Sequence, residues 1–60
     1  MEYTMKCIKE NKEEVVKKCL AVILGEGYDV DEEMEYNGIN VEEIDDIELA
    51  NTVEEYGVEL

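Results

Sequence analysis

Positive charge ends early in this chain. All five lysines lie within the first 18 residues, whereas residues 19 to 60 contain fourteen Asp and Glu residues and no Lys, Arg or His. Five lysines and four glutamates give the first segment a formal charge of +1; the rest carries −14, and the sum is −13. Such a block repels itself and opposes compaction, so a chain that folds with it either uses the electric field or is screened from it.

The length limits the size of the core. Sixty residues make one small domain, and we treat residues 1–60 as a single domain. A domain of this size buries only about 60% of the surface that its unfolded chain exposes. The apolar fraction is nevertheless 45%, near that of globular proteins and above that of acidic disordered chains. We therefore expect a folded domain that is strengthened by association with another subunit.

The apolar segments are too short for a membrane protein. The first residues lack the apolar stretch of a signal peptide, and the run from Cys19 to Leu24 is far shorter than the ~20 residues that span a bilayer. We therefore expect a cytoplasmic protein that does not enter membranes. Its two cysteines, Cys7 and Cys19, are expected to be reduced and to act as small buried apolar groups.

Two segments have the alternating polarity of β-strands. In residues 2 to 8, Tyr3, Met5 and Cys7 share one face, which predicts a half-buried strand. In residues 28 to 44, Asn37-Gly38 predicts a hairpin, because a type I′ turn needs positive φ at both central residues. This register separates an acidic face from an apolar face. The apolar face comprises Tyr28, Val30, Met34, Tyr36, Ile39 and Val41.

Residues 11 to 25 have the pattern of a helix. Asn11 followed by Glu14 resembles a capping box, and Gly25 stands where a helix ends. From Cys19 to Leu24 the helix is apolar nearly all round, whereas a helix that is covered on one side keeps a polar face. We therefore expect its last turns to be buried on two sides, by another element or by another copy of the chain.

Residues 45 to 60 fit two structures. The spacing of Leu49, Val53 and Tyr56 favours a helix from about 46 to 56, with Gly57 after its end. With Ile47, the first two of these residues also fit one face of a fourth strand. We therefore predict an α+β fold in the order β-α-β-β followed by a short helix or a fourth strand, with the antiparallel hairpin packed on one helix.

The missing residue types exclude several kinds of site. Without Ser, His or Arg, the chain cannot form Ser-His or Cys-His nucleophile pairs, and so small a domain has little room for the pocket that carboxylate catalysis needs. Asp29, Asp31 and Glu33 resemble the start of an EF-hand loop, but Met34 and Asn40 replace its required Gly and final Glu. Two cysteines without His make a poor zinc site. We expect no enzyme, no cofactor and no metal centre.

The carboxylates themselves suggest the leading function. Nucleic acid is excluded as a direct ligand, because its phosphates must be neutralised by Lys or Arg. Alternate residues of a strand lie ~6.7 Å apart, so the acidic hairpin face would present a row of charges that imitates nucleic acid. This row would occupy the basic groove of a nucleic-acid-binding protein. Its predicted partner-binding residues are Asp29, Asp31, Glu33, Glu35 and Glu42.

In composition and size, the chain is similar to small acidic inhibitors that phages and mobile elements direct against nucleic-acid enzymes of their hosts, such as anti-CRISPR and anti-restriction proteins. This similarity implies a non-enzymatic protein that binds a basic protein. The alternative is a structural module in which Leu20, Ile23 and Leu24 form an oligomer interface and the acid only maintains solubility. In both cases we expect a homodimer or a higher oligomer.

The charge predicts how stability depends on salt. Because self-repulsion is screened by ions, the melting temperature should rise when ionic strength increases from ~0.01 M to ~0.15 M, where the Debye length falls from ~30 Å to ~8 Å. Thermal unfolding followed by circular dichroism measures this. A melting temperature that does not change with salt would mean that the carboxylates are already paired or well separated.

Overall fold

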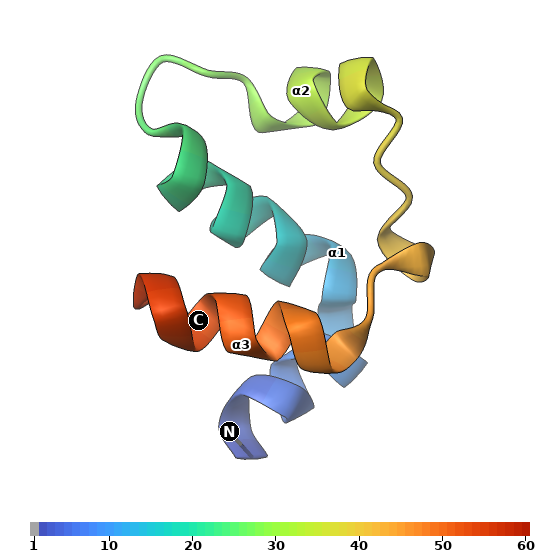
Figure 1. Ribbon diagram of the computed structural model, residues 1–60, viewed down its shortest axis with the longest axis vertical. Coiled ribbons are helices and arrows are strands. Elements are labelled where there is room, and N and C mark those ends of the chain that lie inside the picture. Colours follow the sequence, from blue (N-terminus) through green and yellow to red (C-terminus); the bar gives the residue numbers. More distant parts are fainter. Residues whose placement is uncertain (1) are drawn as a thin grey trace.

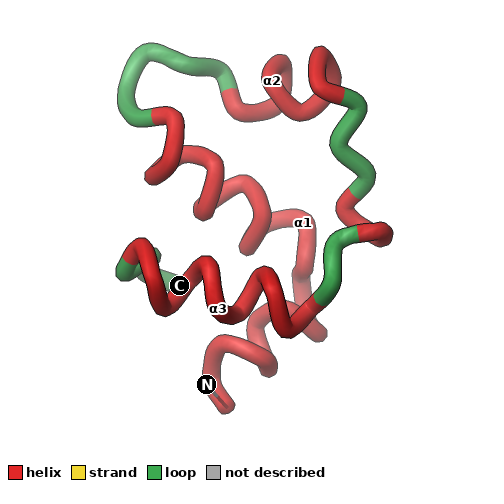
Figure 2. Tube along the Cα trace, in the orientation of Figure 1, coloured by secondary structure: helices red, strands yellow, loops and turns green. Residues whose placement is uncertain are grey.

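The computed structural model describes residues 2–60, and within this range the chain consists of helices and the loops that connect them, without a strand. Helix α1 spans Glu2–Leu24, α2 spans Val30–Asn37, the single 3-10 turn η1 spans Val41–Glu43, and α3 spans Asp46–Tyr56 (Figure 1). Figure 2 shows helices and loops but no strand among the described residues. The α+β prediction, with its strand over residues 2 to 8 and its hairpin over residues 28 to 44, is therefore wrong.

Helix α1 is the central element. Its second half lies between α2 and α3, and the chain between α2 and α3 passes along one side of the molecule (Figure 1). Among the described residues, α1 contacts α2, η1 and α3, most extensively α3, whereas α2 and α3 do not contact each other. The packing of the domain therefore depends on α1, which contacts α2 on one side and α3 on another.

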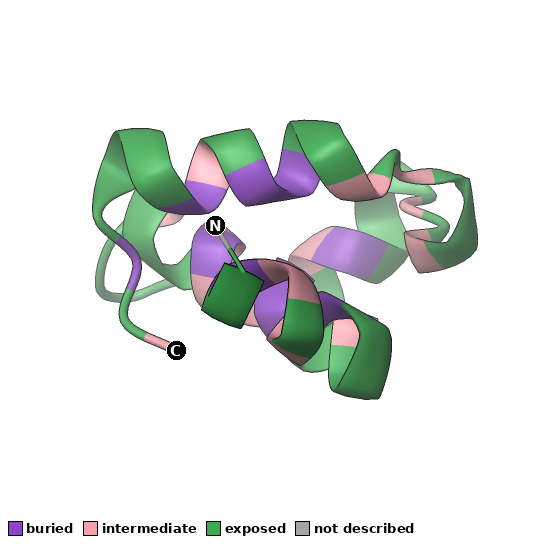
Figure 3. Cartoon of the chain, turned by 90° about the horizontal axis from the view of Figure 1, so that it is seen from below, coloured by how far each residue is buried: buried purple, intermediate pink, exposed green. Residues whose placement is uncertain are grey.

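The core lies mainly where α1 meets α3. Buried positions face inward on both helices, and the outer faces are exposed (Figure 3). Ala50 is completely buried, and its small side chain leaves room for the two helices to approach each other. The buried apolar residues are Ile8, Val15, Val16, Cys19, Met34, Leu49, Ala50, Val53 and Val58.

Residues 2 to 8 form the first turns of α1 because their burial repeats at helical spacing. Thr4 and Ile8 are buried and lie four residues apart, whereas Tyr3 is 65% exposed. The alternating polarity of these residues predicts the opposite, with Tyr3 on the buried face and Thr4 on the exposed face. A window of seven residues contains fewer than two helical turns, which is too short to separate period 2 from period 3.6 by polarity alone.

Asn11 divides α1 into two halves. Its backbone is extended (φ −155°, ψ 79°), and the backbone N–H of Glu14 donates to its Oδ1 over 3.2 Å. Its own Nδ2 donates back to Glu14 Oε2, also over 3.2 Å. Asn11 thus caps the second half of α1, and Gly25 follows its end at φ 83°. The predicted helix over residues 11 to 25 is confirmed, although another helical half precedes it.

The segment that was predicted to be a hairpin contains α2. The type I′ turn requires positive φ at Asn37, but among the described residues only glycines have positive φ. Gly38 instead ends the helix at φ 64°, where its N–H donates to Glu35 O and the N–H of Ile39 donates to Met34 O. These two hydrogen bonds are those of a Schellman motif, which also uses a left-handed glycine.

Helix α3 confirms the prediction of a helix over residues 46 to 56, and the fourth strand is wrong. Asp45 caps its start by accepting from the backbone N–H of Ile47 over 2.8 Å. Gly57 follows its end at φ 61°, and the N–H of Val58 donates to Val53 O over 3.0 Å. Val58 is buried, so this turn returns the chain to the core.

The end of α1 is less covered than its sequence predicts. Val22 and Ile23 are 49% and 48% exposed, so no other element of the described chain buries them on both sides. The remaining alternative, cover by another copy, stays a prediction. No described helix combines the length and the low charge that would let it cross a bilayer.

The cap at Asn11 can be tested by substitution. Asn11→Ala removes the acceptor of the Glu14 N–H and should lower the free energy of unfolding by about 1 kcal/mol, the usual cost of losing a helix cap. Asn51→Ala is the matched control, because Asn51 is exposed inside α3 and caps no helix. Urea unfolding measures both variants. Equal stability of the two would show that Asn11 does not hold the kink.

Candidate functional site

Lysines of α1 bind the other helices to it. Lys12 Nζ lies 2.8 Å from Asp46 Oδ1, at the first residue of α3, and it also donates to the backbone oxygen of Ile44. The Lys12 side chain is only 22% exposed. This ammonium therefore joins the start of the second half of α1 to the start of α3, in a partly buried position where charge pairs are less screened by salt.

Lys17 connects α1 to α2. Its Nζ lies 2.9 Å from Asp31 Oδ1 and 3.8 Å from Glu13 Oε1. The hydrogen bond to Asp31 is the main reason that the pKa of Lys17 is raised above its usual value, because the carboxylate favours the charged ammonium. Lys18 forms a pair within α1, 3.7 Å from Glu14. Three of the five lysines thus neutralise acids inside the domain.

The predicted partner-binding residues do not form one row. Asp29 caps α2, accepting from the backbone N–H of Glu32 over 3.3 Å, and Asp31 is paired with Lys17. Glu33 accepts from Asn37 Nδ2, and it lies about 200° around the helix from Asp31. The row with strand spacing is therefore wrong. The remaining two positions are exposed and form no ion pair among the described residues: Glu35 on α2 and Glu42 on η1.

The outward face of α2 is different from the one that the sequence predicted. Glu32, Glu35 and Tyr36 line a shallow hollow there, and the Tyr36 side chain is 86% exposed. Glu32 was missed as a site residue, and Tyr36 was assigned to the core. The signal that would have found this face is Asp29 followed by Glu32, which is a capping-box pattern and predicts the start of a helix. We call Glu32, Glu35 and Tyr36 the α2 face.

The predicted oligomer interface divides in two. Leu20 and Ile23 line an apolar cleft of about 210 Å³ between α1, the chain from 39 to 44, and α3. Leu24 is half-buried and does not line this cleft. The structure therefore brings two of the three residues together with apolar side chains from other elements, in a place that the helical stripe alone did not indicate.

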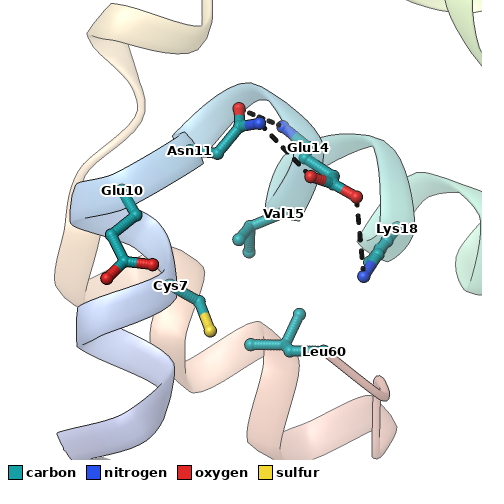
Figure 4. A pocket seen from close by; sticks show the side chains of 7 residues that line it. All are labelled: Cys7, Glu10, Asn11, Glu14, Val15, Lys18 and Leu60. Atoms are coloured by element: carbon teal, nitrogen blue, oxygen red, sulfur yellow. Dashed lines mark hydrogen bonds and ion pairs between the residues drawn. The ribbon is translucent and has the colours of Figure 1, made fainter.

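The hollow at the kink offers little chemistry. Its volume is about 120 Å³, and three of its polar side chains contact one another, from Asn11 to Glu14 and from Glu14 to Lys18 (Figure 4). The Cys7 thiol points toward Leu60 (Figure 4). Cys19 is buried elsewhere in the core, and burial raises the pKa of its thiol, which suppresses the reactive thiolate. The described residues contain no group of three side chains placed to hold a metal ion.

Comparison with protein-family models, with curated proteins and with solved structures finds no match for this chain. The site is therefore defined by its geometry. It has two parts: the acidic α2 face and the apolar cleft.

The role of Lys12 in joining α1 to α3 can be tested against another lysine of the same helix. Lys12→Ala should lower the free energy of unfolding by about 1 kcal/mol, because it removes a partly buried ion pair and a hydrogen bond to a backbone carbonyl. Lys18→Ala removes the same charge but only an exposed pair within one helix, and should cost at most about 0.5 kcal/mol. Chemical denaturation compares them, and a larger loss for Lys18→Ala would contradict this assignment.

Proposed function

We propose that this protein is a non-enzymatic inhibitor that binds a nucleic-acid-binding protein and occupies its basic groove in place of nucleic acid. It would act in the cytoplasm. The observation that carries the proposal is the separation of the charges: Lys12, Lys17 and Lys18 pair with acids of the domain, and outward carboxylates of α2 and η1 pair with no cation of the described residues. Those carboxylates, which form no ion pair within the described range, are Glu32, Glu35, Glu42 and Glu43.

These acids stand on short helices with fixed ends. Asp29 caps α2 and Asn40 caps η1, accepting from the Glu42 N–H over 3.1 Å, while Gly38 ends α2 in a left-handed conformation. Because the backbone that carries these charges is already ordered, binding costs less backbone conformational entropy than it would for a flexible acidic tail. A strongly acidic surface also accelerates encounter with a basic partner and disfavours acidic ones.

Tyr36 adds a second means of recognising a basic groove. It projects from the same hollow as Glu32 and Glu35, and at 86% it is the most exposed of the large apolar and aromatic side chains. Arginine, the residue that often contacts phosphates in such grooves, also stacks on aromatic rings and pairs with carboxylates. The α2 face therefore offers both groups that a nucleic-acid-binding arginine prefers.

The second candidate is the assembly module. Val22 and Ile23 are each about half exposed beside the apolar cleft. If copies of the chain associated through this surface, its apolar side chains would be buried away from water, which is favourable. Ionic strength separates the two candidates: an acidic mimic loses affinity steeply as salt increases, whereas an apolar interface does not.

Charge reversal on the α2 face tests the proposed function. Glu32→Lys with Glu35→Lys should remove binding to nucleic-acid-binding proteins, because it turns two outward acids into cations. The matched control is Glu55→Lys with Glu59→Lys, the same charge change at exposed positions in and after α3, which does not contact α2. Each protein is immobilised, exposed to cell lysate at low salt, and eluted with a salt gradient or with duplex DNA.

The expected result is that the original chain and the α3 control retain nucleic-acid-binding proteins, that DNA releases them, and that the α2 variant retains none. Circular dichroism confirms that all three are folded. Retention by the α2 variant equal to that of the control, or retained proteins that resist both salt and DNA, would contradict the proposal.

A further inference from the structure

The apolar cleft is built from three separate parts of the chain. Leu20 and Ile23 come from the second half of α1, Ile39 and Ile44 come from the chain around η1, and Leu49 comes from α3. Leu49 is buried, whereas Ile23 is about half exposed, so the cleft has an apolar floor and an open upper edge. Its lining therefore consists of side chains that would gain from being covered.

Of the two polar side chains at this cleft, one forms a hydrogen bond within the domain and the other is an acid without an ion pair in the described chain. The Thr52 hydroxyl is engaged, because it donates to the backbone oxygen of Glu48 over 2.9 Å. The Glu48 carboxylate is exposed at the cleft and forms no ion pair among the described residues. A single unneutralised acid beside an apolar hollow is complementary to an apolar group that has a cation next to it.

The volume indicates which class of ligand fits. An apolar cavity of ~150 Å³ accommodates one benzene-sized group, and pockets for small molecules or cofactors have ~300–1,000 Å³. At about 210 Å³, the cleft takes one or two side chains rather than a whole cofactor. A helix that lays apolar residues at i, i+3 or i+4, and i+7 along a groove presents side chains in this way.

We propose that this cleft receives the apolar side chains of a basic amphipathic helix on the partner protein, with Glu48 pairing with a Lys or Arg of that helix. This inference rests on the proposed function, since it adds an anchoring site to the acidic surface that attracts the partner. Attraction by charge then sets how fast the partner arrives, and the cleft sets how long it stays.

Charge favours a basic partner over a second copy of this chain. Each copy has a net charge of −13. A second copy seated through the same cleft would bring its own Glu48 toward that of the first, and like charges across an interface cost binding energy. The chain offers no Lys, Arg or His after residue 18 to compensate this repulsion locally.

Two neighbouring residues provide a matched test. Ile23 lines the cleft and Val22 does not, although both belong to α1 and their exposed fractions are 48% and 49%. Ile23→Glu and Val22→Glu therefore add the same charge at the same exposure, and only the first adds it to the cleft. Glu48→Gln, with Glu55→Gln as its control on the same helix, tests the pairing carboxylate.

The probe is a synthetic helical peptide with Leu at i, i+3 and i+7 and Arg on its other face, and its affinity is measured by fluorescence anisotropy. We expect Ile23→Glu to weaken binding about tenfold or more and Val22→Glu less than about twofold. Glu48→Gln should weaken binding more than Glu55→Gln. The same peptide with Glu in place of Arg should not bind.

Equal effects of the two glutamate substitutions, or equal binding of the Arg and Glu peptides, would overturn the cleft assignment. If the protein alone sediments as a dimer and Ile23→Glu dissociates that dimer, the cleft receives a second copy of the chain and the assignment to a partner helix is overturned. If Ile23→Glu retains the same DNA-releasable partners as the original chain, the proposed function stands and the proposed role of the cleft is contradicted. Peptide binding as expected, with no DNA-releasable partner in lysate, supports the cleft and contradicts the proposed function.

Discussion

All five lysines of this protein lie in α1, so every ion pair between side chains of two elements must start from that helix. Lys12 reaches the start of α3 and Lys17 reaches the first turn of α2, whereas α2 and α3 do not contact each other within the described chain. The helix that holds the cations is also the helix that holds the core together. Self-repulsion of the acidic segment is therefore relieved only where that segment faces α1.

Carboxylates of α2 and η1 that face away from α1 have no cationic partner among the described residues. On α2 this applies to Glu32 and Glu35, which stand beside Tyr36, while Asp31 is neutralised by Lys17. The fold thus separates acids that pair with lysines of α1 from acids that face outward. The same small domain also has an apolar cleft between α1, the chain from 39 to 44, and α3.

Sequence patterns identified the parts of this fold that have local capping signals, although residues 45 to 60 also fitted a fourth strand. The Asn11 cap, the end of α1 at Gly25 and helix α3 follow from capping residues and helical spacing. The hairpin prediction was wrong because a left-handed glycine after Asn fits the end of a helix as well as it fits a type I′ turn. In this chain the backbone N–H of Ile39 donates to Met34 O, so Gly38 ends a helix in a Schellman motif. Asp29 followed by Glu32 was the sequence signal that favoured a helix here, and it would have found the α2 face. The cleft combines side chains from three separate parts of the chain, so local patterns could not predict it.

The most direct test of the central claim is whether this protein and nucleic acid exclude each other on one captured partner. The purified partner is mixed with labelled duplex DNA and increasing amounts of this protein, and the species are resolved by analytical ultracentrifugation. Two binary complexes, with the DNA complex replaced as this protein is added, are the predicted result. A ternary complex of partner, DNA and this protein would contradict the occupation of a nucleic-acid groove by the acidic surface.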